Sequence, residues 1–214
     1  MKSQKLTLLL FIITSHAALG QDYEIRTLFK SPANRASGGY GAVVNKLTAI
    51  NGEFANMVEA YGGWYINHRF LLGAGGASVT NNLPVPEEFS VAPGENMSYQ
   101  YVQFGLMLEY TLWSHRAVHF AFHTFNGPGL TVQYRRFGWD DDDYPWHDFE
   151  DHQHAPNWFF VTEPGVKVEF NLFKWMRLSP GISYRAVFNS TASGLTDKDL
   201  SGTSVNLALK FGKF

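Results

Sequence analysis

The stretch "VQFGLMLEYTL", residues 102–112, decides the fold class. Its even positions are large and mostly apolar, whereas its odd positions are small or polar and include Glu109. Strict alternation of this kind is the pattern of a β-strand with one apolar face and one polar face. The chain is therefore predicted to form such strands wherever the pattern returns.

The alternation returns along most of the chain. It predicts eight strands, at residues 38–50, 54–66, 70–80, 99–112, 117–136, 158–172, 176–188 and 202–214. The motif "NGPG", residues 126–129, interrupts the fifth strand and could be a hairpin turn, which would give nine strands. We keep one strand with a bulge or kink there, because a closed bacterial barrel formed by one chain normally has an even strand number.

The connections between the predicted strands differ in length. Tight turns at one end of the predicted barrel alternate with long polar connections at the other. The turns are 67–69, 113–115 and 173–175, and the long connections are 81–98, 137–157 and 189–201. The link at 51–53 is the one short connection at the end that carries the long ones. Short turns at one end and long loops at the other are typical of outer-membrane barrels. We therefore expect an eight-stranded antiparallel up-and-down transmembrane β-barrel at residues 37–214, with its loops outside the cell.

Residues 1–20 are predicted to be a secretory signal peptide. Lys2 and Lys5 precede the apolar run "LTLLLFIIT", and the segment ends in small residues up to Gly20. Residues 21–36 are then a periplasmic N-terminal segment. Without the two lysines, 15 basic and 19 acidic residues remain, so the mature chain carries a formal charge of −4 and nucleic acid is not expected as a partner. The chain has no cysteine, so its stability must come from packing and hydrogen bonds.

The polar face indicates which side of the barrel meets lipid. Its predicted charges balance: Glu59, Glu109, Glu163 and Glu169 against Arg135, Lys167, Arg185 and Lys210. A soluble secreted barrel, the alternative, would turn a densely charged face to water, whereas a narrow lumen suits a few compensated charges. Aromatic residues also cluster beside the tight turns, as in an interfacial girdle: Trp64, Tyr65, Trp113, Phe173 and Trp175. The apolar face is therefore predicted to contact the bilayer.

Four stretches resemble one protein family. These are "SGGYGAVVNKLTAINGEFANM", "GGWYINHRFLLGAGG", "FFVTEPGVKVEFNLFKWMRLSPGISYR" and "DLSGTSVNLALKFGKF". They look like a family of small, mostly uncharacterised outer-membrane β-barrel proteins of Bacteroidota, with the eight-stranded architecture of the OmpX/OmpA type. The resemblance implies location in the outer membrane of a Gram-negative bacterium, contact with the lipid bilayer and lipopolysaccharide, and no known catalytic residues. Phe214 resembles the terminal aromatic that the barrel-assembly machinery reads, although Phe211 has the matching parity.

Two histidines raise the alternative of a lipid-modifying enzyme of the small-barrel class. A three-residue turn at 113–115 would pair Leu112 with Arg116 and place Glu109 opposite His119, and such a pair could orient a base. Neither His119 nor His123 is followed two residues later by serine, as a deacylase arrangement needs. We therefore expect no catalytic residues.

The turn at 173–175 leads to a second register prediction. It pairs Leu172 with Met176, and therefore Glu163 with Arg185 in a salt bridge across the lumen. Such contacts would plug the interior, which disfavours the other alternative, a narrow channel or small-ligand carrier.

The loop "WDDDDYPWHDFEDHQH", residues 139–154, has the residue types of a metal site but not the spacing. Asp140 and Asp142 are followed by Tyr144 and Pro145, where a calcium loop needs glycine. We expect a hydrated surface loop, with no metal ligands and no cofactor. A surface partner is expected to contact loops 81–98, 137–157 and 189–201. Three prolines make loop 81–98 stiff without giving it regular structure. The predicted function is that of a structural or surface-interaction protein, in adhesion or binding.

Overall fold

The computed structural model describes residues 37–67, 69–136 and 156–212. The predicted signal peptide, the segment 21–36, the acidic loop 139–154 and Phe214 lie outside these ranges. Among the described residues, no helix has the length and apolar character needed to cross a membrane.

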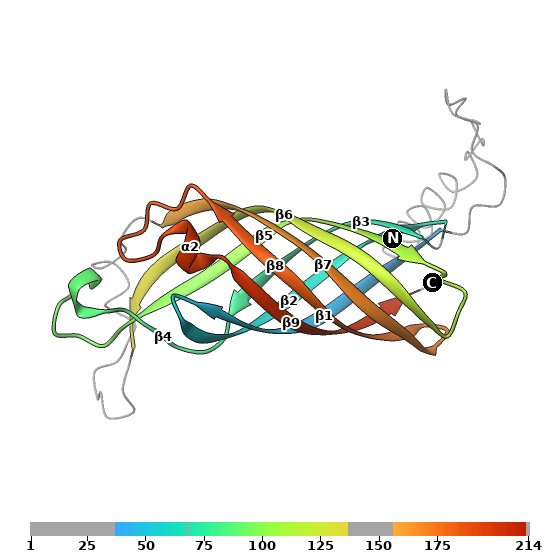
Figure 1. Ribbon diagram of the computed structural model, residues 1–214, viewed down its shortest axis with the longest axis horizontal. Helices are drawn as coiled ribbons and strands as arrows, with labels where there is room; N and C mark the ends of the chain where they lie inside the picture. The colour runs from blue at the N-terminus through green and yellow to red at the C-terminus, as the bar shows by residue number, and fades with distance from the viewer. Residues whose placement is uncertain (1–36, 68, 137–155, 213–214) are drawn as a thin grey trace, which may run out of the picture. The chain divides into compact units, whose positions relative to one another are not determined.

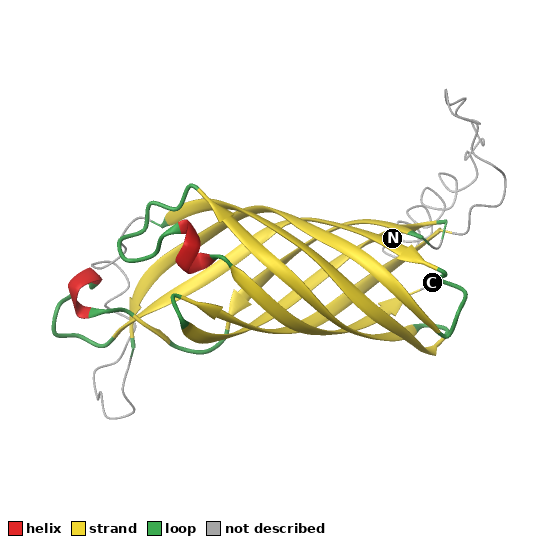
Figure 2. Cartoon of the chain, viewed as in Figure 1, coloured by secondary structure: helices red, strands yellow, loops and turns green. Residues whose placement is uncertain are grey.

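The described chain consists of strands joined by turns and two short helices (Figures 1 and 2). In order these are β1 (Ser37–Ile50), β2 (Glu53–Ile66), β3 (Phe70–Val79), β4 (Leu83–Pro84), the 3-10 helix η1 (Glu87–Phe89), β5 (Met97–Leu112), β6 (Val118–Arg135), β7 (Asn157–Phe173), β8 (Met176–Phe188), α2 (Asp197–Leu200) and β9 (Gly202–Gly212). The two-residue β4 and the helix η1 lie in a loop that was expected to lack regular structure.

Eight of these strands form a closed antiparallel barrel, as predicted. Each pairs with its neighbours in the chain, β3 pairs with β5 across the connection that holds β4, and β9 returns to β1. The motif at 126–129 lies inside β6, so the hairpin alternative is wrong. The register of β6 against β5 is the same at Gly129, opposite Gln103, as at Asn126, opposite Leu106, so no extra residue is inserted there.

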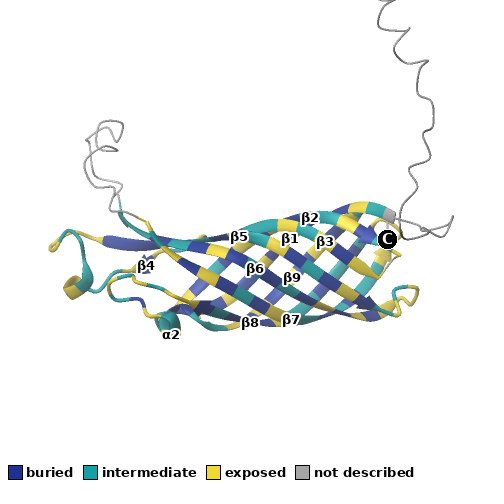
Figure 3. Cartoon of the chain, turned by 90° about the horizontal axis from the view of Figure 1, so that it is seen from above, coloured by how far each residue is buried: buried dark blue, intermediate teal, exposed yellow. Residues whose placement is uncertain are grey.

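The two faces of the strands follow the predicted parity (Figure 3). In β5, Leu106 is 57% exposed on the outer wall, whereas Met107 and Glu109 are buried in the lumen. The outer wall is therefore mostly apolar, and most acids and bases of the strands turn inward.

Aromatic side chains surround the short turns on the outer wall. Trp64, Trp113 and Trp175 are exposed there, and the rings of Phe173 and Trp175 stack with centroids 5.6 Å apart. The prediction for Tyr65 was wrong, because this side chain is buried in the lumen, where its hydroxyl bonds to that of Thr111.

The register is correct at one predicted hairpin and wrong at another. Asn171 faces Arg177 across β7 and β8, as the predicted register requires, but at the turn itself the register shifts and Met176 pairs with Phe173 instead of the predicted Leu172. Between β5 and β6, however, Leu112 faces Phe120 instead of Arg116. The turn spans 113–117: Trp113 has a left-handed φ of 53°, and the amide of Arg116 donates to the Trp113 carbonyl. This longer turn moves His123, and not His119, opposite Glu109.

We expect Gly105→Ala to destabilise the barrel, because β5 and β6 approach each other closely at this point. A Cβ at Gly105 would lie 2.3 Å from the Asn126 carbonyl oxygen and 2.7 Å from the Gly127 Cα. Overpacking of this kind costs about 1–3 kcal/mol of unfolding free energy. Urea unfolding in phosphatidylcholine vesicles, followed by tryptophan fluorescence, measures it. The matched control is Gly39→Ala, where nothing lies within 4 Å of the new Cβ. Equal stability of the two variants would contradict the close approach.

Candidate functional site in the barrel lumen

The lumen has two ends, which are named here by their connections. At the turn end β2, β5 and β7 finish and β3, β6 and β8 begin, with connections that include 113–117 and 174–175. At the loop end β6 finishes and β7 begins, and the connections 51–52, 80–96 and 189–201 lie there. The first residues of β1 and the last of β9 meet at the turn end, where Tyr40 faces Gly212. Between the two ends, buried side chains fill the interior.

An ion cluster fills the lumen toward the turn end, and we name it the Lys210 cluster. It consists of Lys210, Glu109, Glu169, Lys167, Arg177 and His119. The Lys210 Nζ lies 2.5 Å from Glu109 Oε1 and also contacts Glu169. Arg177 Nη1 donates to Glu169 Oε2 over 3.3 Å. Since five strands supply these groups, their ion pairs connect the barrel wall across its interior.

A second ion cluster, the Lys46 cluster, lies further toward the loop end. Lys46 contacts Glu59 and donates to Glu163 Oε1 over 2.9 Å. Glu163 also accepts from Ser183 Oγ at 2.6 Å and from Gln103 Nε2 at 3.1 Å. Both carboxylates are buried and paired, as a buried charge requires.

The predicted salt bridge between Glu163 and Arg185 does not form, although the pairs on either side of these residues keep the predicted register. Lys46 reaches Glu163 from across the lumen. Arg185 instead points toward the loop end, where its Nε donates to the Leu200 carbonyl at 2.7 Å and its Nη2 to the Ala49 carbonyl at 3.0 Å. Register determines which backbones are adjacent, whereas long charged side chains find partners along and across the lumen.

The pairing of Glu109 with His119, which the enzyme alternative relied on, does not form. His119 Nε2 lies 2.9 Å from Glu169 Oε2, and its Nδ1 lies 3.1 Å from the Arg116 carbonyl oxygen. His123 is buried opposite Glu109, but its Nδ1 makes no hydrogen bond within the described chain. Both nitrogens of His119 are therefore engaged with oxygen acceptors.

Arg177 and Lys46 were not predicted from the sequence to lie in the lumen, and Arg135 was wrongly placed there. Arg177 shares the parity of Ser179 and Arg185, so alternation could have found it. Lys46 was harder to assign, because its neighbours Asn45 and Leu47 do not distinguish a polar from an apolar face. Arg135, predicted to be inside, lies at the end of β6, where its half-exposed side chain pairs with Glu95 at 3.1 Å.

An apolar cluster closes the loop end, and we name it the loop-end cap. It consists of Leu83, Tyr99, Tyr101, Phe159, Val187, Leu195 and Leu200. Two loops meet in it: the Tyr99 hydroxyl donates to the Ser193 carbonyl at 3.1 Å, and a Cβ at Gly194 would lie 2.5 Å from the ring of Phe89. Loops 81–98 and 189–201 are therefore packed together and not independent.

The helix α2 gives loop 189–201 a defined shape. Its N-cap is a capping box, in which the Asp199 carboxylate accepts from the Thr196 amide at 2.9 Å and from its hydroxyl at 2.6 Å. These hydrogen bonds hold the pKa of Asp199 below its usual value. The spacing Thr196-x-x-Asp199 was the sequence signal for this turn of helix.

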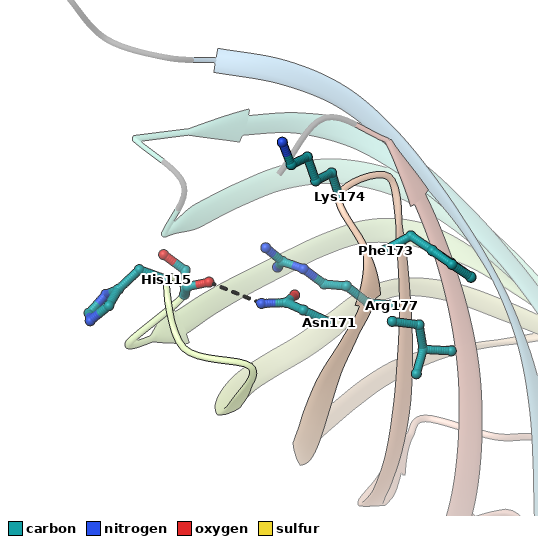
Figure 4. Close-up of a pocket in the computed structure, with 7 residues that line it drawn as sticks. His115, Asn171, Phe173, Lys174 and Arg177 are labelled. Atoms are coloured by element: carbon teal, nitrogen blue, oxygen red, sulfur yellow. Dashed lines mark hydrogen bonds between the residues drawn. The ribbon is translucent and has the colours of Figure 1, made fainter.

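A cavity of about 770 Å³ opens at the turn end (Figure 4). It is lined by Ser114, His115, Asn171, Leu172, Phe173, Lys174 and Arg177. Asn171 ties the two hairpins beside it, donating to the Ser114 carbonyl at 3.4 Å and to that of Arg116 at 2.8 Å. The buried Arg177 joins this cavity to the Lys210 cluster. The cavity therefore lies between two hairpins of the turn end, next to the filled interior.

The described part of the chain also shows whether any group of side chains could bind a metal ion. Among residues 37–67, 69–136 and 156–212, no group of three or more His, Cys, Asp or Glu could hold a metal ion. The acidic loop 139–154 lies outside these residues.

Removing the charge of Glu169 is expected to destabilise the barrel strongly. Glu169→Gln keeps the shape but leaves Lys210 and Arg177 with less compensating charge, and breaking a buried pair costs about 3–5 kcal/mol. The matched control is Glu95→Gln at the exposed pair with Arg135, where the cost is below about 1 kcal/mol. Urea unfolding of both variants in vesicles measures the difference. Similar losses would show that the Lys210 cluster does not hold the barrel together.

Comparison with known proteins supports the architecture. No family model and no curated protein sequence matches this chain. Among solved structures, Neisserial surface protein A is similar, with a TM-score of 0.52, 10% identity, and coverage of 85% of this chain and 99% of that one. The N-terminal β-barrel domain of Pseudomonas aeruginosa OprF has a TM-score of 0.50, 7% identity, and coverage of 84% and 99%. The resemblance to a Bacteroidota family stays a prediction. The chain has the fold of the small outer-membrane β-barrels.

Proposed function

We propose that this protein spans the outer membrane of a Gram-negative bacterium and acts at the cell surface through its loop end, without conducting solutes. The observation that carries the proposal is the filled lumen, with two ion clusters beneath the loop-end cap. The apolar outer wall supports contact with the lipid bilayer. The name of Neisserial surface protein A is in keeping with a surface role, at the level of the shared fold.

The interior supports a structural role for the lumen in place of transport. A channel needs a continuous aqueous path, whereas here Lys46, Lys210 and Arg185 cross the lumen and are almost fully buried. Above them, Leu195 and Leu200 of the loop-end cap have no exposed surface. A solute at the turn-end cavity would therefore meet ion pairs first and apolar side chains next.

The loop end supports a role in binding because part of it has a defined shape. Gln133, near the end of β6, accepts a hydrogen bond from the amide of Val91 and donates one to the carbonyl of Phe89. These two bonds hold loop 81–98 against β6. A surface ordered before it binds loses less entropy on association than flexible loops do. We propose that loops 81–98, 137–157 and 189–201 together contact lipopolysaccharide and a surface partner.

The enzyme alternative receives little support from the lumen. His119 has both ring nitrogens engaged, and its side chain has no exposed surface. A general base must reach the proton that it abstracts. We therefore propose that His119 stabilises Glu169 and takes part in no reaction.

The proposed location and orientation can be tested with two epitope insertions in the producing bacterium. An epitope after Gly94, which has a φ of 89° and open space around it, is expected to be labelled on intact cells. The matched epitope after Lys174, in the β7–β8 turn, is expected to be labelled only after the outer membrane is permeabilised. Both chains should be found in the outer-membrane fraction. Labelling in the reverse order, or recovery in the periplasm or medium, would contradict the proposal.

A second measurement tests the closed lumen. The purified barrel in planar lipid bilayers is expected to give no stepwise conductance, because the ion clusters and the loop-end cap leave no aqueous path. A general porin reconstituted in the same way provides the positive control. Reproducible single-channel steps from the refolded barrel would favour the channel alternative.

A further inference from the structure

Charge is distributed unevenly between the two ends of the barrel. Within residues 37–67, 69–136 and 156–212, every aspartate and glutamate that is not buried lies at the loop end: Glu53, Glu87, Glu88, Glu95, Asp197 and Asp199. At the turn end, the exposed charged side chains of the same residues are all basic, namely Arg69, Arg116 and Lys174. The turn end therefore attracts anions.

The cavity at the turn end gathers part of this positive charge. Lys174 and Arg177 both line it, and no carboxylate of the described chain does. Lys174 is exposed on the turn 174–175 and takes part in no ion pair with another described residue. In Figure 4 the side chains of Lys174 and Arg177 extend to the same side of their hairpin as His115. Two cations therefore contribute to one wall of a cavity whose volume, about 770 Å³, exceeds that of a phosphate group.

The opposite part of the lining is apolar. Leu172 and Phe173 are 46% and 58% exposed, and in Figure 4 Phe173 extends away from the guanidinium of Arg177. Phe173 stacks on Trp175, which in turn stacks on Phe211 with ring centroids 6.1 Å apart. Exposed aromatic side chains of this kind are enriched where a membrane meets water. The cavity therefore joins a cationic wall to an apolar surface.

The geometry points to the headgroup of an anionic phospholipid as the ligand of this cavity. Its phosphate is held by Lys174 and Arg177, and its acyl chains lie along Leu172 and Phe173. The inference rests on the proposed membrane location and orientation, in which the turn end faces the periplasm and the phospholipid leaflet. Basic pockets beside membrane-spanning segments bind lipid headgroups. Free phosphate would satisfy the two cations but has nothing to offer the apolar part of the lining.

The cavity is formed before a ligand arrives. Asn171 ties its two hairpins together through the carbonyls of Ser114 and Arg116, at 3.4 and 2.8 Å. Arg177 is held from the other side by Glu169, to which its Nη1 donates over 3.3 Å. A preorganised site loses little entropy when its ligand binds. The lipid is therefore expected to bind without a change in the barrel.

Native mass spectrometry of the refolded barrel tests the site. The protein in detergent micelles is incubated with equal amounts of phosphatidylglycerol and phosphatidylcholine that carry the same acyl chains, and the lipid adducts are quantified. Lys174→Gln removes the exposed cation of the cavity, and the matched control Lys198→Gln removes an exposed lysine of α2 at the loop end. Glycerol 3-phosphate, which lacks acyl chains, is added as a competitor. Heat-modifiable migration reports whether each variant is folded.

We expect the barrel to retain phosphatidylglycerol in preference to phosphatidylcholine. Lys174→Gln should lower this retention about fivefold, the effect of one basic residue beside an anionic lipid. Lys198→Gln and an equal concentration of glycerol 3-phosphate should leave it unchanged. The proposal is overturned if the folded barrel shows no preference, if the two variants lose retention equally, or if glycerol 3-phosphate displaces the lipid. The assay uses purified protein, so its failure is distinct from a failure of the epitope labelling that tests the membrane location.

Discussion

The ammonium group of Lys210 lies between two carboxylates, Glu109 from β5 and Glu169 from β7. Lys210 belongs to the last strand, so these ion pairs connect three separate parts of the wall through the lumen. A buried charge is tolerated only when it is paired, and each member of the Lys210 cluster supplies the compensation that the others need. This mutual dependence makes the filled lumen a single unit, which is the basis of the proposal that the barrel acts at its surface and does not conduct solutes.

The outer wall obeys the opposite constraint. In the proposed membrane location this wall meets lipid, which offers no hydrogen bonds, so every backbone group must be paired within the sheet. Closure of β9 on β1 removes the last free edges of that sheet. Side chains on this wall are accordingly mostly apolar. Inside the barrel Asn206 donates to Ser183 at 2.9 Å, and on the outer wall Asn126 donates to Thr124 at 3.1 Å.

Most of the fold could be predicted from the sequence, because alternation and loop lengths depend on local pattern. The eight barrel strands and the parity of the outward-facing residues follow from it, whereas the continuity of β6 through residues 126–129 was inferred from the even strand number of bacterial barrels. Individual contacts could not be predicted. Glu163 binds Lys46, which is distant in sequence and lies across the lumen, and the identity of such a partner depends on the barrel's curvature and on side-chain reach. A four-residue shift in the register of β6 against β5 was enough to exchange His119 for His123 opposite Glu109.

The hydrogen bonds of Arg185 depend on which strands of the barrel have already paired. Its guanidinium holds carbonyls of Ala49, at the end of the first strand, and of Leu200, just before the last strand. The bond to Leu200 lies within the connection between β8 and β9 and needs only that hairpin, whereas the bond to Ala49 forms only in a chain whose first and last strands have already paired.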